Sequence, residues 1–189
     1  MKLGVLALQG AFREHRLMLE HCGADVVEVR SPEQLDDLAG LVIPGGESTT
    51  IGKMMVRWGL LGKIQERYAS GMGIYGTCAG MILLAKEIVD SDQPRLGLMD
   101  IVVKRNAFGR QRESFEADLQ VPEFGPEPLR AVFIRAPYVQ TAGPEVQVLA
   151  KVNGKIVIAR QGRCLVTAFH PELTNSDQVH RYFMKMLKN

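Results

Sequence analysis

Apolar runs and amphipathic stretches alternate along the first half of the chain. Short apolar segments typical of strands in a parallel sheet, buried on both faces, are residues 2–9, 25–30, 40–44 and 73–76. Helical spacing of apolar positions is found between them, at residues 11–23 and 50–70. Three glycines inside the second stretch predict that this helix is broken. After the fourth strand, a further helix is predicted from Cys78 to about Lys86.

In the second half of the chain, strand-like segments follow one another closely. They are residues 114–121, 131–137, 146–152, 155–161 and 164–170. Asn153-Gly154 between two of them predicts a two-residue hairpin, and a last helix is predicted from about Ser176 to Leu187. The whole pattern predicts an α/β fold in a single domain over residues 1–189. We expect an open, mostly parallel sheet with helices on both faces and an antiparallel extension.

Composition and charge narrow the class of protein further. The 189 residues are 46% hydrophobic and 23% charged, as in an ordinary globular domain. A net charge of +2 gives no reason to expect nucleic acid as a partner. Nor does any apolar run approach the roughly 20 residues needed to span a membrane. The three cysteines cannot all pair and show no metal-like spacing. We therefore expect free thiols, a reducing cytoplasm, and neither a metal nor another cofactor.

Cys78 is the first candidate for chemistry. It lies where a strand turns abruptly into a helix, and Gly76-Thr77-Cys78-Ala79-Gly80 has the pattern of a nucleophile elbow with cysteine in place of serine. A helix start favours the thiolate, and the backbone N–H of Ala79 would face a developing oxyanion. The alternative is a buried cysteine at a glycine-rich turn. The pentapeptide alone does not decide between the two.

His170 is the candidate general acid and base that such a thiolate needs. It ends a strand-like segment and precedes Pro171-Glu172. In an extended segment, residues two apart face the same side, so Glu172 can reach the His170 ring. A strand-end histidine alone is more often structural, but together with Cys78 it predicts a Cys-His-Glu triad. The other histidines are predicted to be solvated or capping residues of helices: His15, His21 and His180.

Pro44-Gly45-Gly46 ends another strand at the sheet edge where open α/β folds bind ligands. A phosphate loop is excluded because the Gly-Lys-Ser/Thr ending is missing. Gly46 is therefore expected to give a second oxyanion donor. Cys22 has no such context, and Cys164, inside a strand, is expected to lie in the core.

These motifs carry a family resemblance. PGGES, GTCAGM and FHPE, in this order and spacing, resemble class I (triad) glutamine amidotransferases. That resemblance covers about residues 3–185. Within the class, the chain is further similar to the glutaminase subunits of pyridoxal 5′-phosphate synthase, the PdxT family. The stretches that carry this similarity are LALQGAFREH, PGGESTT, GTCAGMILLAKEI, RNAFGRQRESFEADL, VFIRAP and FHPELT. Ala79 stands where many other members of the class carry a bulky residue.

The resemblance implies a flavodoxin-like amidotransferase fold and hydrolysis of L-glutamine to L-glutamate and ammonia. Cys78 would attack the side-chain amide, His170 would protonate the departing ammonia, and a thioester would then be hydrolysed. A hetero-oligomer is also implied, with a PdxS-type synthase subunit that uses the ammonia in vitamin B6 biosynthesis from a pentose phosphate and a triose phosphate. The implied glutamine contacts are Gly46, Glu47, Ser48, Arg105, Ile134 and Arg135.

Several alternatives stay open. The chain could be a glutaminase subunit serving a different synthase, or a non-catalytic subunit that senses glutamine. For Arg105 and Arg135 the residues alone favour surface charge, although a zwitterionic substrate needs a cation for its carboxylate and an acceptor for its ammonium. We also expect the isolated chain to be a poor glutaminase. The flexible Gly45-Gly46 segment could turn its oxyanion donor away until the partner binds.

Overall fold

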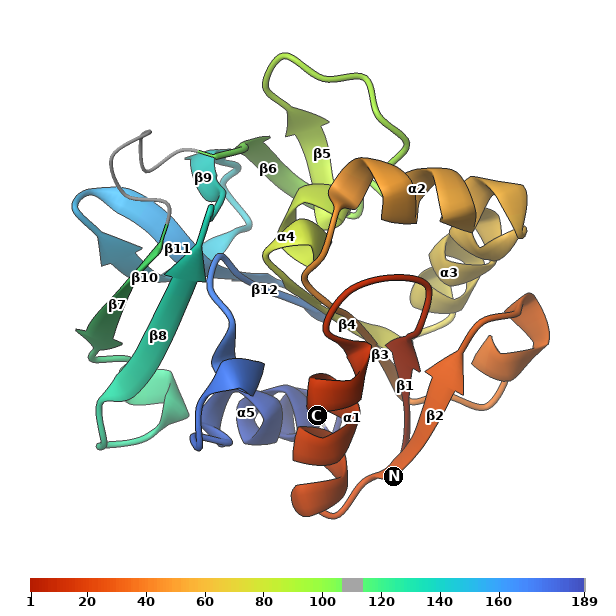
Figure 1. The fold of residues 1–189 in the computed structure, drawn as a ribbon, viewed down its shortest axis with the longest axis horizontal. Helices are drawn as coiled ribbons and strands as arrows, with labels where there is room; N and C mark the ends of the chain where they lie inside the picture. The colour runs from red at the N-terminus through yellow and green to blue at the C-terminus, as the bar shows by residue number, and fades with distance from the viewer. Residues whose placement is uncertain (107–113, 189) are drawn as a thin grey trace.

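The computed structural model, which describes residues 1–106 and 114–188, is built around one mixed sheet of ten strands (Figure 1). Its parallel half consists, in spatial order, of β2 (Asp25–Val29), β1 (Lys2–Leu6), β3 (Gly40–Ile43), β4 (Gly73–Thr77) and β12 (Cys164–Thr167). Every residue of β3, β4 and β12 is buried, as the apolar runs predict for central parallel strands. The predicted parallel sheet is confirmed.

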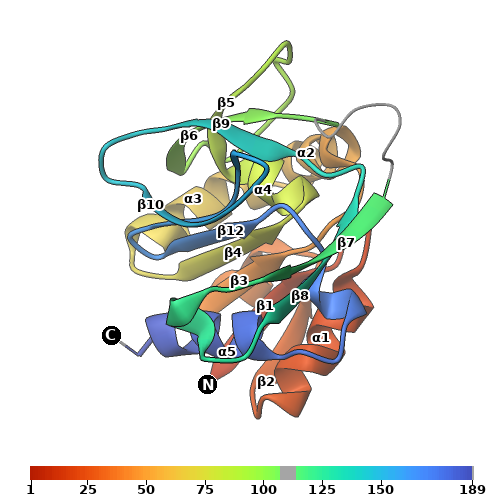
Figure 2. The same ribbon diagram turned by 90° about the vertical axis from the view of Figure 1, so that its left-hand side faces the viewer.

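The sheet continues beyond β12 as a mostly antiparallel half. Its strands are β11 (Lys155–Gln161), β9 (Tyr138–Ala142), β6 (Met99–Lys104) and the edge strand β5 (Ala85–Ile88), with β10 (Gln147–Val152) paired to β11. The predicted hairpin joins β10 to β11. Asn153 and Gly154 have φ of 49° and 77°, as its two-residue turn requires. In Figure 2, β7 (Ser114–Leu119) and β8 (Leu129–Ile134) cross the front of the molecule as a separate antiparallel ribbon.

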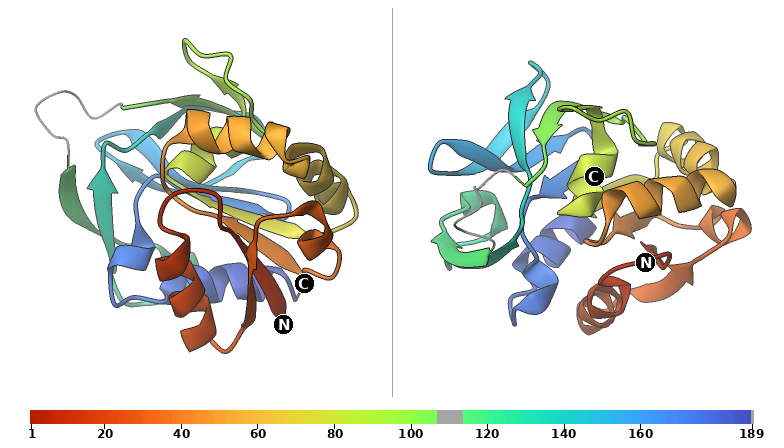
Figure 3. Two further views of the ribbon diagram at one scale, coloured as in Figure 1. Left: turned by 45° about the vertical axis from the view of Figure 1, so that its right-hand side comes forward. Right: turned by 45° about the horizontal axis from the view of Figure 1, so that its top comes forward.

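Helices cover both faces of the sheet (Figures 1 and 3). One face carries α1 (Phe12–His21) and α5 (Gln178–Met186), and the other carries α2 (Ser48–Arg57), α3 (Leu60–Ala69) and α4 (Ala79–Leu84). The long helical stretch is broken as predicted, because Gly59 adopts a left-handed φ of 70° between α2 and α3. The α/β fold class is therefore confirmed. Within the two described ranges, no helix has both the length and the apolar character needed to cross a membrane.

Some boundaries and strands differ from the prediction. The helix after Cys78 ends at Leu84 rather than near Lys86, because residues 85–88 pair with β6 as an edge strand. The prediction also lacks β5, β6 and β9. Exposed residues interrupt β5 and β9, whereas β6 alternates buried and partly exposed positions, a signal that the prediction misses.

Candidate active site

Cys78 lies on a sharp turn between the carboxyl end of β4 and the start of α4. Its φ of 48° and ψ of −99° are values that a residue with a side chain rarely adopts. Close packing explains the flanking glycines. A Cβ on Gly76 would lie 2.5 Å from the Gly80 carbonyl carbon, and one on Gly80 would collide with the Ile43 carbonyl oxygen. The predicted elbow is thus confirmed as geometry, with its strain at a candidate nucleophile.

His170 reaches the same place from the loop that follows β12. A Cβ on Gly45 would collide with the His170 ring and lie 3.5 Å from Cys78 Cβ, so the backbone of Gly45 packs against both side chains. His170 Nδ1 lies 2.7 Å from Glu172 Oε1. The predicted contact therefore exists, but its local structure is wrong. Residues 171–173 form a turn of 3-10 helix, η3 (Pro171–Leu173), rather than an extended segment.

The protonation states of His170 and Glu172 depend on each other. Burial lowers the pKa of His170, but hydrogen bonds with Cys78 and Glu172 outweigh it and raise that pKa to about 10. Burial raises the pKa of Glu172, but the neighbouring His15 and His170 lower it more, so the net shift is downward. At neutral pH the ring of His170 is therefore protonated and the carboxylate of Glu172 is ionised.

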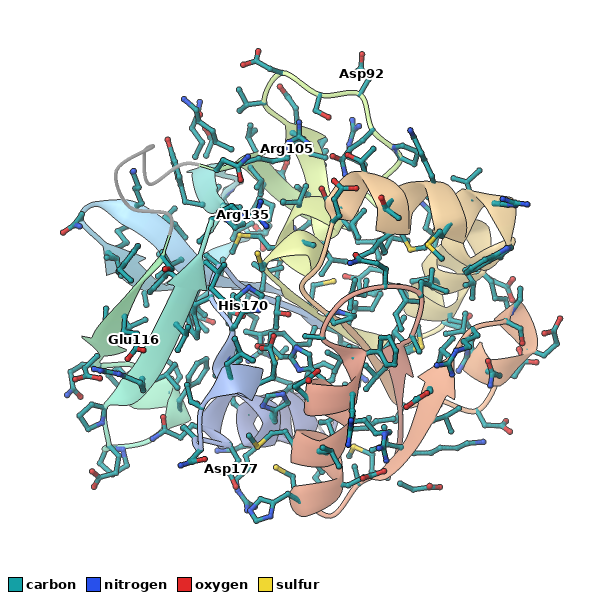
Figure 4. All side chains as sticks on the ribbon, in the orientation of Figure 1. Asp92, Arg105, Glu116, Arg135, His170 and Asp177 are labelled. Carbon is teal, nitrogen blue, oxygen red and sulfur yellow. The ribbon has the colours of Figure 1, made fainter. Side chains whose placement is uncertain are left out.

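A cavity of about 430 Å³ opens over Cys78 and His170. Its lining comes from both halves of the sheet: Gln9, Gly46, Glu47, Ser48, Cys78, Ala79, Ile82, Arg105, Asn106, Ile134, Arg135 and His170. Every residue that the sequence predicts for the site therefore lines the cavity, except Glu172, which lies behind His170. Figure 4 shows Arg105 and Arg135 near His170, at the end of β6 and of β8 respectively.

The side of the cavity that carries Arg105 and Arg135 has a strained backbone, and a hydrogen bond holds the Arg105 side chain. Arg135 and Asn106 have positive φ angles of 42° and 48°. Arg105 Nη1 donates a 3.0 Å hydrogen bond to Gln93 Oε1, and Ser48 Oγ donates a 3.2 Å bond to the same oxygen. Gln93, which is 8% exposed, thus ties two cavity residues together. Gln93 is absent from the predicted site, because no local motif marks it.

The glycine loop opposite is held by the segment that joins β1 to α1. The Gly45 carbonyl accepts a 3.0 Å bond from Ala11 N–H, and Glu47 N–H donates a 2.7 Å bond to Gln9 Oε1. The Glu47 carboxylate caps α2 and accepts a 2.6 Å bond from Thr50 N–H. Burial raises the pKa of Glu47, but its hydrogen bonds with Thr49 and Thr50 lower that pKa by more, so the net shift is downward. A negative charge therefore stays at the cavity wall.

Two histidines contradict the prediction of solvated or capping residues. His15 and His180 are both fully buried, and His15 Nδ1 lies 2.9 Å from His180 Nε2. The signal that identifies them is helical spacing: Phe12, His15 and Leu19 fall on one face of α1, and His180 precedes Phe183 by one turn of α5. The side chain of His21 is 73% exposed, as predicted.

The remaining cysteines lie outside the cavity lining. Cys164 is fully buried in β12, as predicted for a core residue, and burial raises the pKa of its thiol to about 12. Cys22 is half-buried, and all three cysteines are free. In the part of the chain that the structure describes, no cluster of histidine, cysteine and carboxylate side chains could hold a metal ion.

Known proteins resemble this chain over nearly its whole length. The model of the SNO glutamine amidotransferase family matches residues 5–189. The pyridoxal 5′-phosphate synthase subunit PdxT of Pelotomaculum thermopropionicum is 64% identical over 98% of this chain and 94% of its own length. The protein with the same name from Carboxydothermus hydrogenoformans is 60% identical over 98% of this chain and 97% of its own.

Solved structures agree with the sequence matches. A crystal structure of a glutamine amidotransferase superposes with a TM-score of 0.94 at 49% identity, covering 99% of each chain. At 17% identity, a putative GMP synthase protein from Thermoplasma acidophilum has a TM-score of 0.72 over 100% of this chain and 94% of its own, which shows the shared fold. Within the quoted resemblance motifs, residues 107–113 lie outside the described residues. The resemblance is confirmed, and the chain belongs to the SNO glutamine amidotransferase family.

Proposed function

We propose that residues 1–189 form a single glutaminase domain that hydrolyses L-glutamine to L-glutamate and ammonia with the triad Cys78, His170 and Glu172. One observation carries this proposal. Cys78, on a strained turn beside a protonated His170, faces a cavity that also holds an anionic and two cationic side chains. Such a cavity is matched to an amino acid whose side chain carries a carbonyl carbon.

In the first half-reaction, the Cys78 sulfur attacks the side-chain amide carbon of glutamine. The carbonyl oxygen becomes an oxyanion, for which the backbone N–H groups of Ala79 and Gly46 are the proposed donors. Nδ1 of His170 is held by Glu172, so Nε2 is the nitrogen that faces the reaction. His170 gives its proton to the leaving nitrogen, ammonia departs and a thioester remains.

In the second half-reaction, water replaces ammonia. The now neutral His170 takes a proton from water, the hydroxide oxygen attacks the thioester carbon, and the C–S bond breaks. The new side-chain carboxyl group gives its proton to solvent, glutamate leaves, and the Cys78 sulfur and the protonated ring of His170 return to their starting state. Throughout, Glu172 holds the ring in the tautomer that keeps Nε2 toward the substrate.

The α-carboxylate and α-ammonium of glutamine need charged partners. Arg105 and Arg135 provide cations in the lining of the cavity, and Glu47 provides the anion in the same lining. Ser48 and Ile134 complete the proposed contacts with the substrate. This distribution fixes the amino acid at its α-carbon end and leaves its amide over Cys78.

The ammonia has a proposed destination. The relatives that are 60–64% identical are named as subunits of pyridoxal 5′-phosphate synthase. We therefore assign this chain as the glutaminase subunit of a hetero-oligomer with a PdxS-type synthase subunit, which would use the ammonia to build pyridoxal 5′-phosphate from a pentose phosphate and a triose phosphate. Three free cysteines favour a reducing cytoplasm as its location.

The partner is also proposed to activate the glutaminase. The Gly45 carbonyl is fixed by Ala11 N–H, so turning the peptide unit between Gly45 and Gly46 breaks that bond and changes the direction of the Gly46 N–H. Losing one oxyanion donor lowers turnover about 10²–10³-fold. A synthase subunit that docks beside this loop would set its orientation.

Ammonia release from glutamine, measured for the purified chain and then during titration with the synthase subunit, tests the proposal. We expect slow release alone, faster release with the synthase, and trapping of Cys78 by an electrophilic glutamine analogue. Release that responds to another acceptor enzyme instead would identify a different synthase partner. Glutamine binding without trapping or release would identify a non-catalytic sensor. Full release by the chain alone would refute the activation but keep the triad.

A further inference from the structure

A cluster of buried polar side chains lies behind the triad. Its members are fully buried, and none of them lines the cavity. They come from α1, β4, β12 and α5. We call these residues the rear cluster: His15, Tyr75, Thr77, Thr167 and His180. Buried polar groups cost free energy unless they are hydrogen-bonded. The mechanism above uses none of them, so their presence in the core requires another explanation.

The rear cluster touches the triad at Glu172. Oε1 of this carboxylate contacts His170, whereas Oε2 is buried and, among the described residues, makes no well-aligned hydrogen bond. His15 Nε2 lies 3.3 Å from Oε2 and 3.1 Å from Thr77 Oγ1. A proton on Nε2 would therefore lie within reach of both the hydroxyl and the carboxylate. A buried carboxylate oxygen without such a donor would be costly.

The carboxylate decides the tautomers of both histidines. An ionised carboxylate accepts hydrogen bonds and cannot donate one, so the proton of a neutral His15 belongs on Nε2. Its Nδ1 is then an acceptor, and His180 Nε2–H donates to it across 2.9 Å. The opposite tautomer would direct the lone pair of His15 Nε2 at a negative oxygen. His180 Nδ1 ends the chain as a buried nitrogen without a hydrogen-bond partner among the described residues.

Both histidines are neutral in the folded protein. Burial lowers the pKa of His15, with Glu172 and Glu14 opposing that shift and His170 reinforcing it. Burial also lowers the pKa of His180, and His15 adds to this. Tyr75, whose pKa is raised by burial, stays uncharged beside Glu172. The charge of the region is therefore confined to Glu172 and His170.

We propose that His15 and His180 are positioning residues of the glutaminase reaction: His180 fixes the ring of His15, and His15 Nε2–H keeps Glu172 ionised and aligned with His170. The inference rests on the proposed function, because it extends the same triad. It assigns a role to α1 and α5, which cover the face of the sheet opposite α2 and α3.

A first experiment leaves the molecule unaltered. Nitrogen NMR of histidine-labelled full-length chain distinguishes the two neutral tautomers and the charged form, with signals assigned through His15→Gln and His180→Gln. We expect both rings to be neutral and protonated on Nε2 at pH 7. A charged His15, or one protonated on Nδ1, would overturn the proposal. This readout needs no turnover, so it decides the tautomers even if the wild-type chain proves to release no ammonia and the proposed function fails.

A second experiment compares His15→Met with His15→Gln in ammonia release by the complex with the synthase subunit. Methionine fills the space without a donor, whereas glutamine can place an N–H near the position of Nε2. We expect His15→Met to lower kcat about 10- to 100-fold, the range for a lost hydrogen bond to a charged group, with KM changed less than about twofold. His15→Gln should restore most of kcat.

The pH profile separates positioning from a merely structural role. Removing a donor from the charged form of Glu172 raises the pKa of that carboxyl. The acidic limb of the kcat profile should therefore move to higher pH by about one unit in His15→Met and stay near its wild-type position in His15→Gln. Equal losses in the two variants with unmoved limbs would refute the proposal, as would a folded His15→Met with wild-type kcat.

His180→Met keeps the test decisive if His15→Met does not fold. It removes the donor that fixes His15 but leaves the His15 ring in place, so we expect a smaller loss in kcat, about 2- to 10-fold, with the same direction of pH shift. Wild-type kcat and pH profile in a folded His180→Met would refute the proposed role of His180. His21→Met is the matched control, because this histidine lies on the same helix as His15 with a side chain that is 73% exposed.

Discussion

The two halves of the sheet build the two sides of the cavity in different ways. On the parallel side, buried strand ends and glycines pack closely beneath Cys78, which is 9% exposed and faces the cavity. On the other side, β6 and the ribbon of β7 and β8 present Arg105, Ile134 and Arg135 at strand ends, and Ile134 is 37% exposed. One side is a packed backbone, and the other is a set of side chains.

This difference separates chemistry from recognition. Bond making needs the sulfur, the ring and the oxyanion donors fixed within a fraction of an ångström, which close-packed parallel strands achieve. Recognition of the α-carbon end needs charges at the right distance, which long side chains on strand ends can provide. Substitutions of Cys78, His170 and Glu172 should therefore lower kcat, whereas those of Arg105 and Arg135 should raise KM.

The largest expected effect is that of Cys78→Ala. Without the sulfur no thioester forms, so ammonia release by the complex should fall by about 10⁶-fold. Binding of glutamine, measured by calorimetry, should persist because the charged wall is untouched. Substantial ammonia release from this variant would show that Cys78 is not the nucleophile and would refute the proposed triad.

Glu172→Gln should come next. The amide cannot stabilise a charged His170 and can hold the ring in the wrong tautomer, so we expect kcat to fall about 10³–10⁴-fold. KM should change by much less, as steady-state kinetics at fixed pH will show. The reverse result, with binding lost and turnover kept, would make Glu172 a substrate contact.

Arg135→Ala tests the recognition side. Arg135 is exposed in the free chain, and bound glutamine would cover its contact with the α-carboxylate. Removing a charged partner from a contact that is desolvated in this way costs about 2–5 kcal/mol, so KM for glutamine should rise at least about 30-fold, with a smaller change in kcat. Arg105→Ala should act in the same direction. If both variants keep the wild-type KM, the arginines are surface charges and the comparison between the two walls fails.

The pH dependence of stability should follow the buried histidines of the parallel side. The pKa values of His15 and His180 are lowered on folding, so below about pH 6.5 the unfolded chain binds more protons than the folded one. The free energy of unfolding should then decrease as the pH falls, by up to about 1.4 kcal/mol per pH unit for each histidine.

Urea unfolding of the wild-type chain and of the variant with both His15→Gln and His180→Gln, between pH 5 and 7, checks this slope. The raised pKa of His170 acts in a separate window: its contribution to stability is complete below about pH 6.5 and is lost as the pH rises toward 10. An identical slope in both proteins between pH 5 and 7 would show that the two histidines are not the groups that titrate.

The smallest effect is expected for Cys22→Ser. Cys22 is half-buried, free and absent from the cavity lining, so kcat and KM should stay within about twofold of wild type and stability within about 0.5 kcal/mol. Labelling of the remaining thiols should then report Cys78 alone, because Cys164 is fully buried. Loss of activity in Cys22→Ser would show that the reaction depends on Cys22, although this residue does not line the cavity.

Local chemistry explains which parts of the site the sequence reveals. The elbow needs small residues at fixed distances from Cys78, and Glu172 is only two positions from His170, so both can be found in short motifs. Arg105 and Arg135 emerge from the family resemblance, since nothing beside them in the chain distinguishes a substrate contact from a surface charge.

Other parts depend on the tertiary structure. Gln93 matters because its oxygen joins Ser48 to Arg105, residues that are 57 positions apart in the chain and meet only after folding. His15 lies in a charge-rich helix, and its burial follows from how that helix packs on the sheet. The predicted helix after Cys78 is too long because the edge pairing of β5 ends it.

The glycines around Cys78 also divide the site for protein engineering. At Gly45 and Gly80 any added methyl group collides with the His170 ring or with a carbonyl oxygen, so randomising these codons would yield mostly inactive or unfolded clones. The opposite wall is lined by side chains, and its restriction is milder: the positive φ of Asn106 and Arg135 disfavours β-branched residues there. A library aimed at amides other than glutamine should therefore vary Asn106, Ile134 and Arg135, and leave the backbone that carries the sulfur unchanged.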